Sequence, residues 1–289
     1  MIRQILFPTD FSASAIHAFP AVLRLAAHFG AEVTTVHTYL TPSISAGYLT
    51  HTIKEILESI ELEAFEHIKD KLPLLHAMAA DLGLGDIQIR HAISPGKDII
   101  EGLARSAGTE KGDLIVMGTS GVQGIQELFK GSVASEVMEN APCPVLVIPQ
   151  AAGLAPEVMR IVYAIGDGPH EPASQIWIKQ FAIGLGATLV WTNQPGIDFN
   201  AFADFQASQQ DISINQHFAF CASWQAEGDL LSFLEAEKAD LLALQVRQTG
   251  FFHELFQQNF GKHLAKTLIF PLLGIPEAFL ARQETPGGE

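Results

Sequence analysis

The sequence predicts an α/β protein built from two tandem domains, each with a mostly parallel five-stranded sheet flanked by helices. The length of 289 residues is close to the size at which a single hydrophobic core stops growing, which favours two domains. In each half, short apolar runs alternate with helical patterns, as expected for crossovers between parallel strands. Residues 112–149 align with residues 239–276 at a constant offset of 127 without a gap, which indicates an internal duplication.

In the first half, strand and helix patterns follow one another in order. The helix expected at 13–29 has apolar residues at helical spacing and closes at Gly30. Residues 114–117 form a continuous apolar run between Asp113 and Gly118, which is typical of a strand buried on both faces. Residues 94–96 are Ser-Pro-Gly and are expected to turn the chain. The expected strands are 5–8, 33–38, 87–93, 114–117 and 144–148, and the expected helices are 13–29, 50–82, 97–107 and 132–140.

The second half repeats this order after a small, uncharged segment at 150–156 that suits a linker. A strand is expected at 160–165, a helix at 173–185 and a strand at 188–192. Only residues 193–211 separate its second and third strands, which leaves no room for a counterpart of the long helix at 50–82. The predicted organisation is a first domain at 1–150, a second domain at 157–281 and a flexible tail at 282–289.

Composition excludes several classes of protein. The formal net charge of −15 argues against binding of nucleic acid or anionic membrane, because such partners need a basic stripe. No apolar run approaches the roughly 20 residues that cross a bilayer, and the start of the chain lacks the layout of a signal peptide, so a cytoplasmic location is expected. Cys143 and Cys221 are expected to be buried thiols. The 11 histidines are scattered, without the spacing of a zinc site, so no metal site is expected.

A glycine-rich segment follows the apolar strand at 114–117. Gly118 and Gly121 are followed, after nine residues, by Gly131 and Ser132, where a helix is expected to open. Glycines allow close approach of the backbone to a ligand, and a helix start presents unpaired N–H groups, so the segment is expected to cradle phosphate. A flexible turn is the simpler alternative for one or two of these glycines, but it does not explain the whole spacing.

Asp10 follows the first strand and is expected at the same edge of the sheet, because the carboxyl ends of parallel strands meet there. Its carboxylate could accept hydrogen bonds from ribose or adenine. The alternative role is that of N-cap for the helix at 13–29. The two roles are compatible.

These residues resemble the universal stress protein family. The spacing of Gly118, Gly121, Gly131 and Ser132 is similar to the nucleotide-binding pattern of that family, and residues 7–12 look like its first-strand signature. Residues 141–147 are similar to its closing strand. The resemblance covers 1–149 almost fully, and it implies Rossmann-like, adenine nucleotide alpha hydrolase-like domains. It also implies that ATP, ADP or AMP binds the first domain, with or without Mg²⁺, and that the two domains pair through strands 144–148 and 271–275, while a further homodimer stays open. The implied site residues are Pro8, Thr9, Asp10 and Thr38 for the adenosine, and Met117, Gly118, Gly121, Gly131, Ser132 and Val133 around the ribose and phosphates.

The chain departs from the family pattern in two places. Ser120 stands where many members carry an arginine, so a charge that could assist phosphate binding is absent. In the second half, the residues that align with Gly118, Gly121, Gly131 and Ser132 are Gln245, Gln248, Gln258 and Asn259. Side chains at these positions would crowd the phosphates, so the second domain is expected to bind no ATP in the usual manner, although Asp167 aligns with Asp10.

The sequence favours a binding and regulatory protein over an efficient enzyme. No nucleophile, base and orienting group stand together near the predicted cradle, so catalysis of ATP hydrolysis is expected to be slow or absent. One alternative is a slow ATPase or nucleotidyl-transfer enzyme that needs Mg²⁺. Another is a nucleotide-independent module that binds a partner or an apolar ligand through the second domain, where Phe251, Phe252 and Phe256 cluster.

Overall fold

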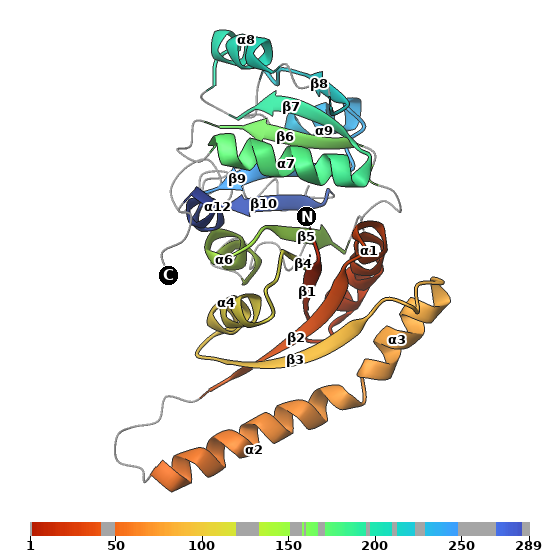
Figure 1. Ribbon diagram of the computed structural model, residues 1–289, viewed down its shortest axis with the longest axis vertical. Coiled ribbons are helices and arrows are strands. Elements are labelled where there is room, and N and C mark those ends of the chain that lie inside the picture. The colour runs from red at the N-terminus through yellow and green to blue at the C-terminus, as the bar shows by residue number, and fades with distance from the viewer. Residues whose placement is uncertain are drawn as a thin grey trace.

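The protein was analysed as a computed structural model, which describes residues 2–41, 50–119, 133–150, 158, 160–166, 171–194, 197–209, 213–222, 229–247 and 270–284. A single ten-stranded sheet, ordered β3-β2-β1-β4-β5-β10-β9-β6-β7-β8, runs through the molecule (Figure 1). The strands of the first half are β1 (Gln4–Pro8), β2 (Glu32–Leu40), β3 (Ile89–Gly96), β4 (Leu114–Thr119) and β5 (Val145–Pro149). Those of the second half are β6 (Arg160–Ile165), β7 (Thr188–Asn193), β8 (Gln216–Phe218), β9 (Leu241–Val246) and β10 (Leu272–Pro276).

Helices cover both faces of this sheet. One face packs against α1 (Ala13–Phe29), α3 (Leu72–Asp81), α7 (Glu171–Leu185), α8 (Phe199–Ser208) and α12 (Glu277–Glu284). The other face packs against α4 (Ile99–Thr109), α6 (Val133–Asn140) and α9 (Asp229–Ala236). The long helix α2 (Thr50–Lys69) lies along the outer edge beside β2 and β3 (Figure 1). Each half is a parallel five-stranded sheet with flanking helices, which confirms the predicted fold class.

The two halves meet edge to edge. Strand β10 pairs antiparallel with β5, with Leu273 opposite Leu146. Beside this ladder, α1 packs against α7, where His28 Nε2 donates a hydrogen bond of 2.7 Å to the carbonyl of Gly184. A side chain at Gly184 would collide with Phe29, since a Cβ there would lie 2.6 Å from the ring atom Cε1. The halves therefore share a hydrophobic core as well as a sheet.

Several boundaries differ from the prediction. The helix expected at 50–82 is two helices, and Pro73 in the first turn of α3 accounts for the break, because proline cannot continue a helix from the preceding turn. The residues expected to turn the chain at 94–96 instead continue β3, which pairs with β2 as far as Gly96. An edge strand tolerates a proline because one side of its ladder needs no donor. Helix α4 begins at Ile99, where Asp98 caps it.

The end of the second half also differs from the prediction. Helix α12 continues to Glu284, so it includes the first three residues of the expected tail at 282–289. Its Leu280 is fully buried in the core on the α1 and α7 face, which explains why the chain stays helical here. Cys143 and Cys221 are buried thiols that form no disulfide with each other, as predicted, and burial raises the pKa of the Cys143 thiol to about 12.

Candidate functional site

A pocket opens at the carboxyl edge of the first half, between the ends of β1, β2 and β4. This is the edge at which open α/β sheets bind their ligands, and the strand order reverses here between β1 and β4. The cavity volume is about 240 Å³, slightly below the roughly 300 to 1,000 Å³ of complete small-molecule sites. Its walls are Pro8, Thr9, Asp10, Ser12, Ser14, Ala15, Val36, His37, Thr38, Ile99, Leu103, Met117, Gly118, Thr119 and Val133.

The loop after β1 holds Asp10 at the mouth of this pocket. The buried Thr9 hydroxyl accepts the backbone N–H of Phe11 at 3.0 Å, and Phe11 has a left-handed backbone with φ of 60°. A left-handed conformation is costly for a bulky residue and is found mainly where a site requires it. His37 Nδ1 donates to the Thr9 carbonyl at 3.1 Å and ties this loop to the end of β2.

Asp10 is not the N-cap of α1. That role belongs to Ser12, whose hydroxyl accepts the N–H of Ala15, whereas the Asp10 carboxylate accepts the N–H of Ser12 at 2.9 Å. Partial burial alone would raise the pKa of Asp10, but the hydrogen bonds from Ser12 outweigh burial and hold this pKa below its ordinary value. Asp10 therefore carries a negative charge at neutral pH and lines the pocket.

Two threonine hydroxyls in the pocket wall have no hydrogen-bond partner among the residues that the structure describes. They are Thr38 Oγ1, at the end of β2, and Thr119 Oγ1, at the end of β4, and both atoms are buried. An unpaired buried hydroxyl costs about 1–3 kcal/mol, so such atoms are uncommon unless a ligand pairs them. Helix α4 approaches Thr38 closely because it has Gly102 at the contact, where a Cβ would lie 2.2 Å from Thr38 Cγ2.

Gly118 is required by packing at the pocket wall. A Cβ at this position would lie 2.1 Å from the carbonyl oxygen of Ser14, in the first turn of α1. The sequence motif suggests that Gly118 lets the backbone approach a ligand. The structure gives a second reason, which is that α1 rests directly against the end of β4.

The structure brings most of the predicted site residues together around one cavity. Pro8, Thr9, Asp10, Thr38, Met117, Gly118 and Val133 all line it, and Gly121, Gly131 and Ser132 lie outside the described residues. Sequence reasoning did not include Ser12, Ser14, Ala15, Val36, His37, Ile99, Leu103 and Thr119. Alternation along β2 and β4 could have indicated Val36 and Thr119, which lie two residues before Thr38 and two after Met117 on the same sides of their strands.

The corresponding positions of the second half carry amide side chains. Ile161 pairs with Leu241 as Ile5 pairs with Leu114, so Ala164 corresponds to Pro8. Ala164 pairs with Thr192 as Pro8 pairs with Val36, which puts Asn193 and Gln194 in the places of His37 and Thr38. Asn193 hydrogen-bonds both backbone groups of Cys221, and Gln194 Nε2 donates to the Ala164 carbonyl at 3.0 Å.

The position of Gly118 is also occupied by an amide in the second half. Gln245 lies there with its side chain buried, and neither amide atom has a hydrogen-bond partner in the described part of the chain. A long side chain thus replaces the glycine that allows close packing in the first half. The remaining substitutions, Gln248, Gln258 and Asn259, lie outside the described residues, as do Asp167, Phe251, Phe252 and Phe256.

Across the described ranges, no three His, Cys, Asp or Glu side chains gather as metal ligands would. His76 and His91 form a pair, with their Nε2 atoms 3.2 Å apart. Within the same ranges, no helix has the length and apolarity needed to cross a membrane.

The fold and the pocket together define a tandem pair of parallel α/β units with a pocket at the sheet edge of the first. Similar architectures are found among solved structures. A universal stress protein from Archaeoglobus fulgidus superimposes with a TM-score of 0.64 at 15% identity, covering 94% of this chain and 96% of that one. A protein of unknown function from Pseudomonas aeruginosa superimposes with a TM-score of 0.57 at 13% identity, covering 98% and 96%. At these identities the likeness concerns the fold alone.

The family is given by the sequence comparisons. The model of the Universal stress protein family matches residues 1–149. A universal stress protein of Methanocaldococcus jannaschii is 32% identical over 151 residues, which cover 51% of this chain and 82% of that protein. One from Thermus aquaticus is 32% identical over 148 residues, covering 51% of this chain and 99% of the relative. The chain belongs to the universal stress protein family, as the sequence motifs predicted.

Proposed function

We propose that this protein is a regulatory protein of the stress response whose first domain binds an adenine nucleotide. The observation that carries the proposal is the pair of unpartnered hydroxyls, Thr38 Oγ1 and Thr119 Oγ1, in the wall of a pocket at the sheet edge. Buried hydroxyls of this kind gain a partner when a polar ligand enters. Val36, Leu103 and Met117 supply apolar walls suited to the flat faces of a purine base.

The remaining groups of the site fit the other parts of a nucleotide. Asp10 is ionised and accepts hydrogen bonds, so it suits ribose hydroxyls or the amino group of adenine. Phosphates would lie beyond Gly118 towards the start of α6 at Val133, where helix N–H groups and the helix dipole favour negative charge. The family motif adds ATP and Mg²⁺ to this proposal as ligands. It also adds Gly121, Gly131 and Ser132 as residues that would surround the phosphates.

We infer that the domains comprise residues 1–150 and 157–281, and that they function as an internal pair joined through β5 and β10. Only the first is assigned a nucleotide. In the second, Asn193 and Gln194 stand in the places of His37 and Thr38 and bond to the backbone, and Gln245 replaces the glycine at the pocket wall. One bound nucleotide per chain is therefore expected.

The proposal is tested by thermal unfolding with ATP, ADP, AMP and GTP, each with and without Mg²⁺. An adenine nucleotide at about 100 times its dissociation constant should stabilise the protein by roughly 2.7 kcal/mol, whereas GTP should stabilise it less. At about 2–4 °C per kcal/mol, this stabilisation should appear as a rise in Tm of roughly 5–11 °C. No shift with any nucleotide would contradict the proposal.

Thr38→Val and Thr119→Val separate a ligand role from a structural role. Each change replaces an unpaired buried hydroxyl by a methyl group, so the ligand-free protein should be as stable as wild type or slightly more stable. Nucleotide affinity should fall by about 5- to 150-fold, since a hydrogen bond worth about 1–3 kcal/mol is lost. The matched control is Thr192→Val, because Thr192 Oγ1 is an equally buried and unpaired hydroxyl in the second half. If all three variants bound nucleotide with equal affinity, the hydroxyls of Thr38 and Thr119 would not contact the nucleotide.

A further inference from the structure

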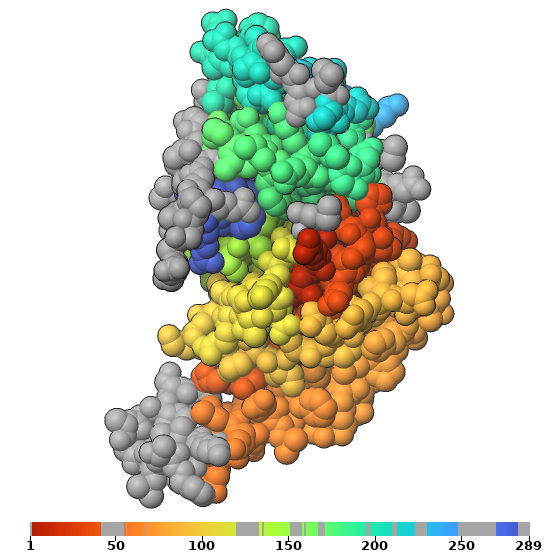
Figure 2. Space-filling model, in the orientation of Figure 1, coloured from red at the N-terminus to blue at the C-terminus, as the bar shows by residue number. Residues whose placement is uncertain are grey.

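The outer helix α2 exposes apolar side chains on the face that points away from the sheet. Its inner side is anchored by Ala64 and Ile68, which are buried beside the edge of the sheet. Farther round the helix from these anchors, Leu62 is 61% exposed and Phe65 is 47% exposed. Residues three apart on a helix are neighbours, so these two side chains form one apolar patch. Figure 2 shows α2, in orange, along the outer lower edge of the molecule.

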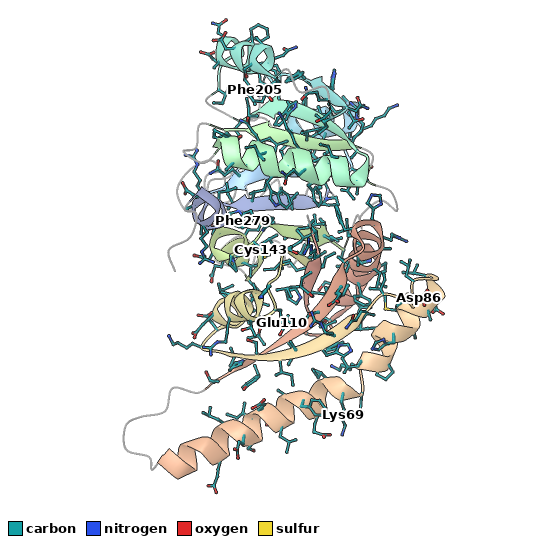
Figure 3. All side chains as sticks on the ribbon, in the orientation of Figure 1. Lys69, Asp86, Glu110, Cys143, Phe205 and Phe279 are labelled. Carbon is teal, nitrogen blue, oxygen red and sulfur yellow. The ribbon has the colours of Figure 1, made fainter. Side chains whose placement is uncertain are left out.

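Negative charge surrounds this patch. Glu58 lies one turn before Leu62, and Glu61 and Glu66 adjoin Leu62 and Phe65 on the helix surface, where all three are exposed. Glu66 forms an ion pair with Lys69, which is labelled near the end of α2 in Figure 3. Over its whole length α2 has glutamates at 55, 58, 61, 63 and 66, and lysines at 54 and 69, so the helix has a net negative charge.

The position of α2 determines how a partner could bind it. The backbone N–H and C=O groups of a helix are paired internally, so a partner can contact only side chains. A second helix satisfies this requirement, because ridges of side chains on one helix fit into grooves on the other. The apolar residues of the partner helix would cover Leu62 and Phe65. The charged residues of that helix would face the glutamates of α2.

We propose that the outer face of α2 is a docking surface for a basic amphipathic helix of another protein. Apolar residues of the partner, spaced three or four apart, bury Leu62 and Phe65, and flanking Lys or Arg side chains pair with Glu58 and Glu61. Charge complementarity selects this occupant over a neutral or acidic helix. This surface does not depend on the nucleotide site, so either proposal can fail without the other.

The test uses the full chain and a fluorescein-labelled peptide that forms a helix with leucines on one face and lysines on the other. Anisotropy should show saturable binding that weakens as salt rises. Two control peptides accompany it, one with the leucines replaced by alanine and one with the same composition in scrambled order. Both should bind at least about tenfold more weakly, because they lack the apolar face.

Variants locate the peptide on the protein. Leu62→Ser with Phe65→Ser should weaken binding about tenfold or more, and Glu58→Gln with Glu61→Gln should reduce its salt dependence. The matched control is Ile176→Ser with Ile183→Ser, because these isoleucines are 59% and 48% exposed on α7, and it should bind like wild type. Circular dichroism and Tm would establish that each variant is folded.

Three outcomes would overturn the proposal. Unchanged binding by the Leu62 and Phe65 double variant would place the peptide elsewhere. Equally tight binding of the alanine peptide would reduce the effect to general attraction by an acidic protein. A wild-type dimer that dissociates in the double variant, measured by light scattering after size-exclusion chromatography, would assign the face to a second copy of this chain.

Discussion

Replacing Glu171 with glutamine is expected to remove a pH-dependent loss of stability of about 3 kcal/mol that develops in wild type between about pH 4.5 and 7. Glu171 is the first residue of α7, and its side chain is buried against Tyr163 of β6. Burial raises the pKa of this carboxyl to about 7, and the Tyr163 hydrogen bond and the nearby charge of Arg247 act in the opposite direction. The Tyr163 hydroxyl donates to Glu171 Oε1 at 2.9 Å and lies 2.6 Å from Ser174 Oγ.

The sign of the effect follows from proton binding. Below about pH 4.5 Glu171 is protonated in both the folded and the unfolded chain, and it adds no pH dependence. As pH rises from there to about 7, the unfolded chain loses its proton while the folded chain keeps it, so the folded state becomes less favourable. Above pH 7 both states are ionised, and the penalty of the buried charge is complete.

Urea unfolding at several pH values between 4 and 8 measures this contribution. Glu171→Gln keeps an oxygen that accepts from Tyr163, so it should match wild type near pH 4 and exceed it in free energy of unfolding by about 3 kcal/mol at pH 8. Glu235→Gln changes an exposed glutamate on α9 and should leave the wild-type profile unaltered. Parallel profiles for wild type and Glu171→Gln would show that Glu171 titrates normally.

The sequence was sufficient for the fold because its local signals agree with the tertiary structure. Helix α1 occupies the predicted residues 13–29, since an N-terminal serine cap and Gly30, with φ of 64°, mark both of its ends. One error, the turn expected at 94–96, arose where tertiary pairing overrides a local preference. Pro95 reads as part of a turn, but β2 extends far enough to pair with the residues around it.

The site was predictable in position but not in detail. Strand ends and glycine spacing indicated the edge of the sheet at which the pocket lies. The left-handed backbone of Phe11 depends on how the loop closes against β2, which local sequence does not specify. Likewise, the placement of Asn193 and Gln194 opposite the end of β6 follows from the register of β6 against β7, which a residue count between strands cannot determine.

Gly118→Ala is expected to destabilise the first domain by about 1–3 kcal/mol, the usual range for an overpacked contact. The added methyl group would lie 2.1 Å from the Ser14 oxygen and 2.7 Å from the Ser14 carbonyl carbon. These are backbone atoms, so no change of rotamer can relieve the collision, and α1 has to shift away from β4. Urea unfolding of the ligand-free protein measures the loss.

Gly108→Ala is the matched control for this substitution. Gly108 lies in α4, and a Cβ there meets no atom within 4 Å. Alanine is the better helix former, so this variant should gain about 0.5–1 kcal/mol. If Gly118→Ala weakened nucleotide binding but unfolded like wild type, Gly118 would serve ligand approach alone. A loss of stability in the absence of nucleotide instead assigns the glycine to the contact between α1 and β4, and any loss of affinity then follows from displacement of the pocket wall.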